Sequence, residues 1–186
     1  LMKCIILVAF SLLIVNISKA QLTKGNWMLG GNIGFSSGTN KSEFNSPNTY
    51  YNIQINPNVG YFLNDKFATG LKTSIILIGQ RGSGTIYSKY NNYNFGPFIR
   101  YYFMPVDKRI NILAEGVYQY GVEGSRGGST PKSTFSFTTG AVAFFNSSVG
   151  IEFLVSYSSY KFNGFNGSNG IIQLGLGLQV HLEKDK

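Results

Sequence analysis

The chain has 186 residues, enough for one domain, and its 23 glycines, 12 tyrosines and 15 phenylalanines favour strands over helices. Only 13% of the residues are charged, about half the share in a typical soluble domain, whereas the mean hydropathy is zero. The formal net charge is +8 without a basic cluster of the nucleic-acid-binding type, and the only cysteine, Cys4, lies in a segment interpreted below as an export signal, which excludes disulfide chemistry in the mature chain.

Residues 1–20 have the features of a signal peptide. Lys3 precedes an apolar run from Ile5 to Val15, and Ser18-Lys19-Ala20 places small residues three before and one before a cleavage ahead of Gln21. The apolar run is too short for a transmembrane helix, which needs about 20 apolar residues. We therefore expect a mature domain that covers residues 21–186.

Apolar residues alternate with polar or small residues in the mature domain, with the two-residue period of a β-strand. The clearest case is the hairpin at residues 56–74, whose pattern recurs at residues 97–103 and 139–156. A recurring hairpin predicts a meander of antiparallel strands. In chain order the expected strands are residues 27–35, 49–63, 67–79, 93–103, 110–122, 133–145, 149–160 and 170–182.

The connections between these strands alternate in length. Short turns are expected near Asp65, Asp107 and Ser147, and longer loops at residues 36–48, 80–92, 123–132 and 161–169. Outer-membrane barrels combine short periplasmic turns with long outer loops. An even number of strands places both termini in the periplasm, and the barrel must be closed because a free strand edge would expose unpaired backbone groups to lipid.

The last expected strand indicates which face meets lipid. Leu174, Leu176, Leu178 and Val180 lie on one face, and a face with two glutamines, two glycines and His181 lies opposite. We expect the apolar face to point outward and the polar face to line a narrow lumen.

Three sequence features resemble a known family. The signal ending at Ala20-Gln21 and the segments PNVGYFLNDKFATG and PFIRYYF are similar to the outer-membrane β-barrel domain family of porin-like proteins, which includes OmpA-type and OmpX-type small barrels. The resemblance covers residues 21–182. It implies an all-β fold, namely an eight-stranded antiparallel up-and-down transmembrane β-barrel after an N-terminal signal peptide, in the outer membrane of a bacterial cell.

The end of the last strand also resembles a targeting signal. Gln173, Gly175, Leu178 and Val180 are spaced as in the C-terminal signal that the barrel-assembly machinery reads, although the strand reaches Leu182 where the family often has an aromatic residue. This resemblance implies the assembly machinery as a partner during insertion.

Strand parity places several charged and amide side chains in the lumen. Arg100 and Glu115 lie on adjacent strands and are expected directly opposite each other or one diagonal apart. Because a buried charge needs a partner, we expect a plug of paired charges; the alternative is a gate that opens for ions or small solutes. The expected lumen charge network is Lys72, Arg100, Glu115 and Glu152, beside Gln54, Gln119 and Gln173.

The outer loops are expected to be basic. Cationic loops could bind phosphorylated lipid such as lipopolysaccharide, or could simply be solvated. Tyrosines near the outer strand ends suit an aromatic girdle, or alternatively a platform for stacking carbohydrate. The expected outer-loop basic residues are Lys41, Arg81, Lys89, Arg126, Lys132 and Lys161.

The sequence gives little support for catalysis or cofactors. The only histidine, His181, is expected at the periplasmic end of the last strand, away from an outer-rim triad. One histidine without a mature cysteine makes a zinc site improbable. Arg81-Gly82-Ser83-Gly84 lacks the Gly-Lys-Ser/Thr of a phosphate loop. We expect no enzyme activity and no cofactor.

Three functions remain open at this point. The first is a monomeric, non-enzymatic outer-membrane barrel with a plugged polar lumen and a structural or surface-interaction role. The second is a narrow porin-like channel or a carrier for small hydrophobic molecules. The third is a soluble exported barrel of the lipocalin type that binds a ligand inside. The third would turn the leucines of the last strand inward, where Phe62, Phe98 and Phe144 already need space.

Overall fold

The computed structural model describes residues 22–42, 45–81, 87–125, 128–164 and 167–182. The expected signal peptide, residues 1–20, lies outside this part of the chain. No helix among the described residues is long and apolar enough to cross a membrane.

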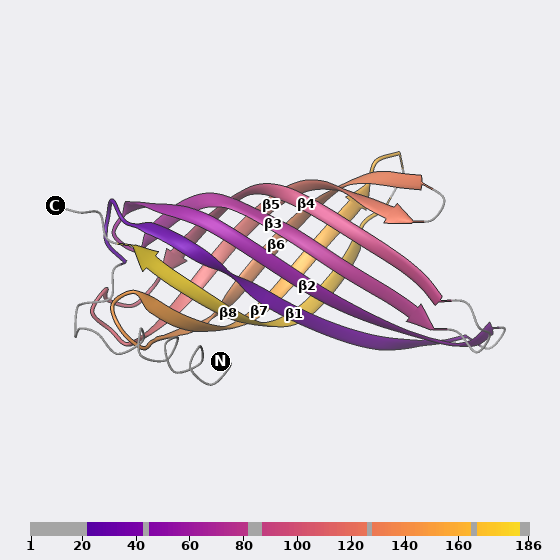
Figure 1. The fold of residues 1–186 in the computed structure, drawn as a ribbon, viewed down its shortest axis with the longest axis horizontal. Helices are drawn as coiled ribbons and strands as arrows, with labels where there is room; N and C mark the ends of the chain where they lie inside the picture. The colour runs from indigo at the N-terminus through magenta and orange to yellow at the C-terminus, as the bar shows by residue number, and fades with distance from the viewer. Residues whose placement is uncertain (1–21, 43–44, 82–86, 126–127, 165–166, 183–186) are drawn as a thin grey trace, which may run out of the picture.

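Eight antiparallel strands form one closed barrel (Figure 1). Each strand pairs with the next along the chain, and the indigo first strand lies beside the yellow last strand, from Trp27↔Leu182 to Phe35↔Leu174. Closure therefore leaves no free sheet edge. The strands are β1 (Trp27–Ser42), β2 (Asn45–Asn64), β3 (Phe67–Arg81), β4 (Tyr87–Tyr102), β5 (Ile110–Ser125), β6 (Gly128–Phe144), β7 (Val149–Phe162) and β8 (Asn169–Leu182).

The eight strands and their order confirm the expected topology, but the connections expected at residues 36–48, 80–92 and 123–132 are much shorter than predicted, whereas the one expected at residues 161–169 does lie between Phe162 and Asn169. β1 continues to Ser42 and β2 begins at Asn45, so most of residues 36–48 is strand. β5 and β6 likewise pair as far as Ser125↔Gly128. The polar composition of these stretches was misleading because strand ends that project beyond the apolar wall need paired backbones rather than apolar side chains.

The two ends of the barrel differ. The described chain ends, Leu22 and Leu182, and the turns β2–β3, β4–β5 and β6–β7 lie at one end, called here the terminal end; the other is the distal end (Figure 1). Local interactions define two of the terminal-end turns. In the β2–β3 turn Lys66 adopts φ = 68°. In the β6–β7 turn the Asn146 side chain accepts hydrogen bonds from the backbone N–H groups of Ser148 and Val149, both at 2.8 Å.

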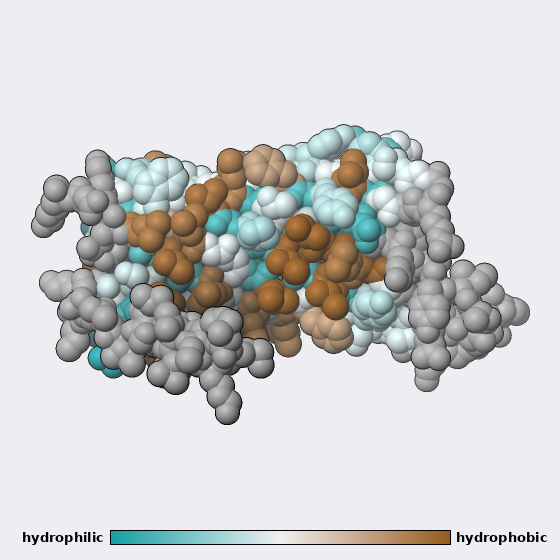
Figure 2. Space-filling view, in the orientation of Figure 1, coloured by the Kyte–Doolittle hydropathy of each residue, from teal (hydrophilic) through white to brown (hydrophobic). Residues whose placement is uncertain are grey.

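The wall has an apolar outside and a polar inside. In β8, Leu174 and Leu176 are 68% and 60% exposed, whereas Gln179 and His181 are almost fully buried. Figure 2 shows apolar side chains over the middle of the outer wall. Two outward threonines satisfy their hydroxyls locally, since Thr69 donates to the Phe98 carbonyl and Thr139 to the Leu113 carbonyl. This orientation contradicts a soluble lipocalin-type barrel, whose apolar face would line the interior.

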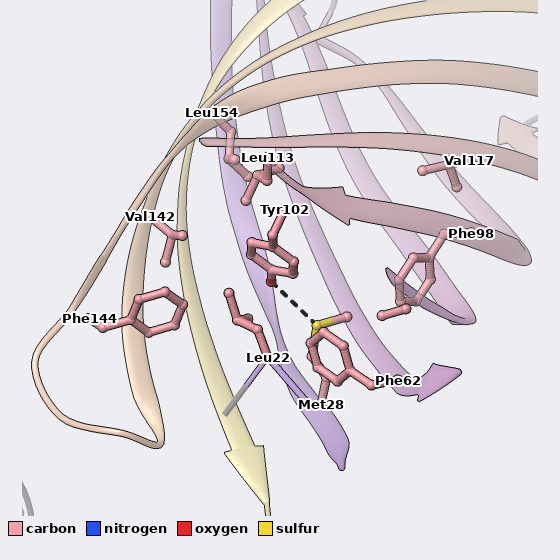
Figure 3. Close-up of a cluster of buried hydrophobic side chains, with 11 residues drawn as sticks. Leu22, Met28, Phe62, Phe98, Tyr102, Leu113, Val117, Val142, Phe144 and Leu154 are labelled. Atoms are coloured by element: carbon pink, nitrogen blue, oxygen red, sulfur yellow. Dashed lines mark hydrogen bonds between the residues drawn. The ribbon is translucent and has the colours of Figure 1, made fainter. Parts of the chain in front are cut away.

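A cluster of buried apolar side chains extends through the lumen from the terminal end toward the middle of the barrel (Figure 3). Leu22, before β1, enters this cluster because its carbonyl accepts a hydrogen bond from Lys66 N at 2.8 Å, while Gly25 N donates to the Phe62 carbonyl at 2.9 Å. The segment before β1 is therefore held at the terminal end of the barrel, with Leu22 buried in the lumen. The cluster consists of Leu22, Met28, Phe62, Ala68, Phe98, Tyr102, Leu113, Val117, Val142, Phe144 and Leu154.

Candidate functional site in the lumen

Four ionic side chains meet in the lumen among the members of the apolar cluster, since Phe98, Val117 and Leu154 each lie two residues further toward the distal end than an ionic residue of the same strand. Arg100 on β4 lies directly opposite Glu115 on β5. Its Nε donates to Glu115 Oε2 at 2.9 Å, and its Nη2 lies 2.7 Å from the same oxygen. Lys72 Nζ of β3 donates to Glu115 Oε1, and Arg100 Nη1 donates to Glu152 of β7. We call Lys72, Arg100, Glu115 and Glu152 the charge network; each is at most 5% exposed.

Arg100 spans the lumen because its guanidinium contacts several strands. Nη1 also approaches Tyr102 Oη at 3.2 Å and Gln179 Oε1 at 3.4 Å. Gln179 in turn donates to Asn58 Oδ1 at 3.2 Å. The network contains two cations and two carboxylates, so its formal charges cancel. The arrangement places four ionic groups in the middle of the barrel without leaving a net buried charge, which would be costly.

Below the charge network lies an aromatic layer. The His181 ring lies 5.5 Å from Phe62, 6.3 Å from Tyr102 and 5.6 Å from Phe144, measured between ring centroids. His181 is thus an aromatic partner at the terminal end, as strand parity places it. No group of three or more His, Cys, Asp or Glu residues suited to a metal ion occurs in the described part of the chain.

Above the charge network the lumen opens into a polar cavity. Ser74 Oγ donates to Gln119 Oε1, and Gln119 Nε2 donates to the Lys72 carbonyl, both at 2.9 Å. A small space of about 30 Å³ lies beside these groups. Beyond it is a cavity of about 630 Å³, called here the distal cup. Its lining includes Tyr50, Asn52, Asn94, Thr134, Tyr160 and Gln173.

The expected outer-loop basic residues are in different places. Lys132 is in β6 rather than a loop and faces the lumen, 3.5 Å from Glu123 and 4.9 Å from the Tyr160 ring centroid. Its assignment to a loop was wrong because residues 123–132 are mostly strand. Lys161 is exposed near the distal end of β7. Lys41, Arg81 and Lys89 belong to β1, β3 and β4, but their side chains lie outside the described part, as does all of Arg126.

Several lumen residues were not identified from the sequence. A ladder of amides follows the β1–β2 wall, in which Gln54, the one member already expected in the lumen, donates to Asn56 at 2.7 Å and Asn56 donates to Asn32 at 2.7 Å. Asn92 donates to Glu123 at 2.6 Å near the distal end. The two-residue period, continued into the stretches interpreted as loops, would have placed Asn92, Glu123 and Lys132 on the inner face.

Comparisons with known proteins support the fold. No protein-family model and no curated protein matches the chain. A solved structure that is similar is Neisserial surface protein A (NspA), with a TM-score of 0.55 and 13% identity over 84% of this chain and 97% of that chain. The N-terminal β-barrel domain of Pseudomonas aeruginosa OprF gives a TM-score of 0.42, 12% identity and coverages of 86% and 98%.

The outer membrane enzyme PagL is a third similar structure, with a TM-score of 0.47, 13% identity, and coverage of 82% of this chain and 98% of that chain. At these identities the likeness is one of fold and assigns no activity. The chain therefore folds as a small eight-stranded barrel of the outer-membrane type.

Proposed function

We propose that this protein is a non-enzymatic, monomeric integral protein of the bacterial outer membrane, with a closed lumen and a structural or surface-interaction role. The observation that carries this proposal is the separation of charge. Among strand residues whose side chains are described, Lys161 is the only charged one on the outer wall, whereas the charge network, Glu123 and Lys132 all face the lumen. A lipid bilayer requires this arrangement, because charge on the lipid face is destabilising.

The distal end then faces the cell exterior, and the terminal end faces the periplasm. Lys161, exposed near the distal end, is placed to meet the phosphorylated head groups of lipopolysaccharide. Insertion by the barrel-assembly machinery would use the end of β8.

The test of membrane integration is extraction of cell envelopes with sodium carbonate. We expect the protein to stay in the pellet, to migrate faster in gel electrophoresis before boiling than after, and to begin at Gln21 by N-terminal sequencing. Release of the protein into the carbonate supernatant would overturn the proposal of an integral barrel.

The closed lumen is proposed from the charge network, which spans the barrel above the aromatic layer. A narrow channel is the competing function, with the same four residues acting as a gate. Planar-bilayer recordings separate the two. We expect no current steps from the wild-type protein; steps from the wild type would support the channel instead.

The variant Arg100→Ala extends this recording to the network itself. It removes the guanidinium that joins Glu115 to Glu152. Current from the variant alone would identify Arg100 as the plug, whereas silence from both proteins would leave the apolar cluster as the principal barrier and remove the gate.

A further inference from the structure

We propose that the distal cup binds a short neutral carbohydrate, of about one or two sugar units. The inference rests on the proposed function, since the cup is presented to the cell exterior only if the distal end faces outward. It concerns a site that is separate from the charge network: Ser74 and Gln119 line its floor, and Lys72 lines the small space beneath them.

The shape of the cup suits a small ligand. Its volume of about 630 Å³ lies within the about 300–1,000 Å³ typical of small-molecule pockets. The cup is blind, because Ser74, Gln119 and the Lys72–Glu115 pair fill the lumen beneath it. A molecule that enters from the distal end is therefore held and not passed through.

The wall of the cup has unused hydrogen-bonding capacity. Asn52, Asn94 and Gln173 are at most 7% exposed, yet each has one amide atom without a hydrogen-bond partner among the described residues: Oδ1, Oδ1 and Nε2, respectively. Thr134 Oγ1 is in the same situation. Buried polar atoms of this kind are costly to leave unpaired. Sugar hydroxyls both donate and accept, so they match a wall that mixes amides with a hydroxyl.

The floor differs from the wall in this respect. Both polar atoms of the Gln119 amide are engaged, by Ser74 and by the Lys72 carbonyl. The Gln119 amide in the floor is thus fully engaged, whereas the wall amides of Asn52, Asn94 and Gln173 each keep one buried atom unpaired, which a rotation of the side chain would turn toward the cup. This contrast points to a site for a ligand in the wall and to a structural role for the floor.

The charge of the cup favours a neutral guest. Among the described residues, its charged lining side chains are Glu123 and Lys132, which pair at 3.5 Å, and Asn92 also donates to Glu123. A charged ligand would therefore lose hydration without meeting a free countercharge. Apolar surface is also present, from Ile76, Ile78 and the rings of Tyr50 and Tyr160, and it suits the C–H faces of a pyranose.

The experiment is saturation-transfer NMR on the full chain, purified in lauryldimethylamine oxide because a maltoside detergent would compete for the cup. The probes are maltose, cellobiose and di-N-acetylchitobiose, with glucose 6-phosphate as the charged comparison. We expect at least one neutral disaccharide to bind with a Kd of about 1 mM or tighter, and glucose 6-phosphate to bind at least about fivefold more weakly, because the described lining of the cup offers no free cation.

Two variants change the wall. Asn94→Leu and Thr134→Val each remove a hydrogen-bonding group and keep a similar volume, and each is expected to weaken binding about tenfold, the cost of one buried hydrogen bond. Asn91→Leu is the matched control, since Asn91 is exposed on the other face of the same strand; its affinity should equal that of the wild type. Heat-modifiable migration in gel electrophoresis verifies that each variant folds. If Asn94→Leu does not fold, Thr134→Val still tests the proposal.

Three results would overturn the proposal: no binding of any neutral disaccharide by the wild type, unchanged affinity in both cup variants, or tighter binding of glucose 6-phosphate. Because binding is measured on the purified barrel, each of these failures is distinguishable from failure of the proposed membrane location, which carbonate extraction tests separately.

Discussion

At the scale of single residues, Arg100 has the largest role in the interior. It is 1% exposed and contacts Glu115, Glu152, Tyr102 and Gln179, which come from β4, β5, β7 and β8. Ion pairs that are buried add little stability over an apolar replacement, but removal of one partner leaves an uncompensated charge. Loss of Arg100 is therefore expected to destabilise the barrel mainly because it would leave a buried carboxylate without its cation.

The variant Arg100→Ala is expected to lower the free energy of unfolding by about 3–5 kcal/mol, because Glu152 would lose its cation while it remains buried. Urea unfolding in lipid vesicles measures this through the fluorescence of Trp27, the only tryptophan. The double variant Arg100→Met/Glu152→Gln keeps the Lys72–Glu115 pair, and its free energy of unfolding should fall by less than that of the single variant. Equal decreases in the free energy of unfolding of both variants would contradict the explanation based on charge.

Lys161→Ala is the control for that experiment. Its side chain is exposed near the distal end of β7, so its replacement should change the free energy of unfolding by no more than about 0.5 kcal/mol.

At the scale of strands, close pairing depends on glycine at specific positions. Gly70 of β3 lies opposite Gly60 of β2, and a Cβ at residue 70 would lie 2.0 Å from the Val59 carbonyl oxygen and 2.5 Å from Gly60 Cα. Both are backbone atoms, which cannot rotate away. At Gly34 of β1 the nearest atom, the Leu174 carbonyl oxygen, would be 3.6 Å away, an ordinary contact.

Gly70→Ala should therefore destabilise the barrel by roughly 1–3 kcal/mol, as overpacking does. Gly34→Ala should be neutral, or stabilising by up to about 1 kcal/mol, because alanine restricts the unfolded chain. The midpoints of urea unfolding compare the two variants with the wild type. If Gly34→Ala lowered the stability of the barrel as much as Gly70→Ala, the space beside each glycine would not be the deciding factor.

The sequence predicted strands well where alternation was strong and poorly where it was weak. The hairpin at residues 56–74 and the inward positions of Arg100 and Glu115 follow from a two-residue period alone. Residues 36–42 of β1 and 45–48 of β2 were taken for a loop because Ser, Gly, Thr and Asn carry little apolar signal. Lys132 was misplaced for the same reason.

Contacts across the lumen could not be predicted by any local pattern. Glu152 meets Arg100 from β7, which does not pair with β4. This contact depends on the stagger of a closed barrel, which alternation within a strand does not encode. The entry of Leu22 into the lumen depends on backbone hydrogen bonds from its segment to Lys66 and Phe62. The amino-acid composition of this segment does not indicate such hydrogen bonds.

At the scale of the whole molecule, the lumen changes along its length: an aromatic layer lies at the terminal end, the charge network lies in the middle among apolar side chains, and the distal cup lies at the other end. The outer wall exposes large apolar side chains over its middle (Figure 2), an arrangement that a lipid bilayer would stabilise.

The position of the bilayer can be tested with one substitution at two depths. Leu176 lies in the middle of the apolar wall and is 60% exposed, whereas Leu182 ends β8 beside Trp27, an aromatic residue that suits the membrane interface. In lipid vesicles, Leu176→Arg should destabilise the barrel by about 2–4 kcal/mol and Leu182→Arg by no more than about 1 kcal/mol, because the cost of a charge falls from the midplane to the interface. Urea unfolding monitored through Trp27 measures the first variant, and heat-modifiable migration measures both, since Leu182→Arg changes the surroundings of Trp27. Equal effects at the two positions would mean that the leucine face does not lie in lipid, and the assignment of the wall to a membrane would fail with it.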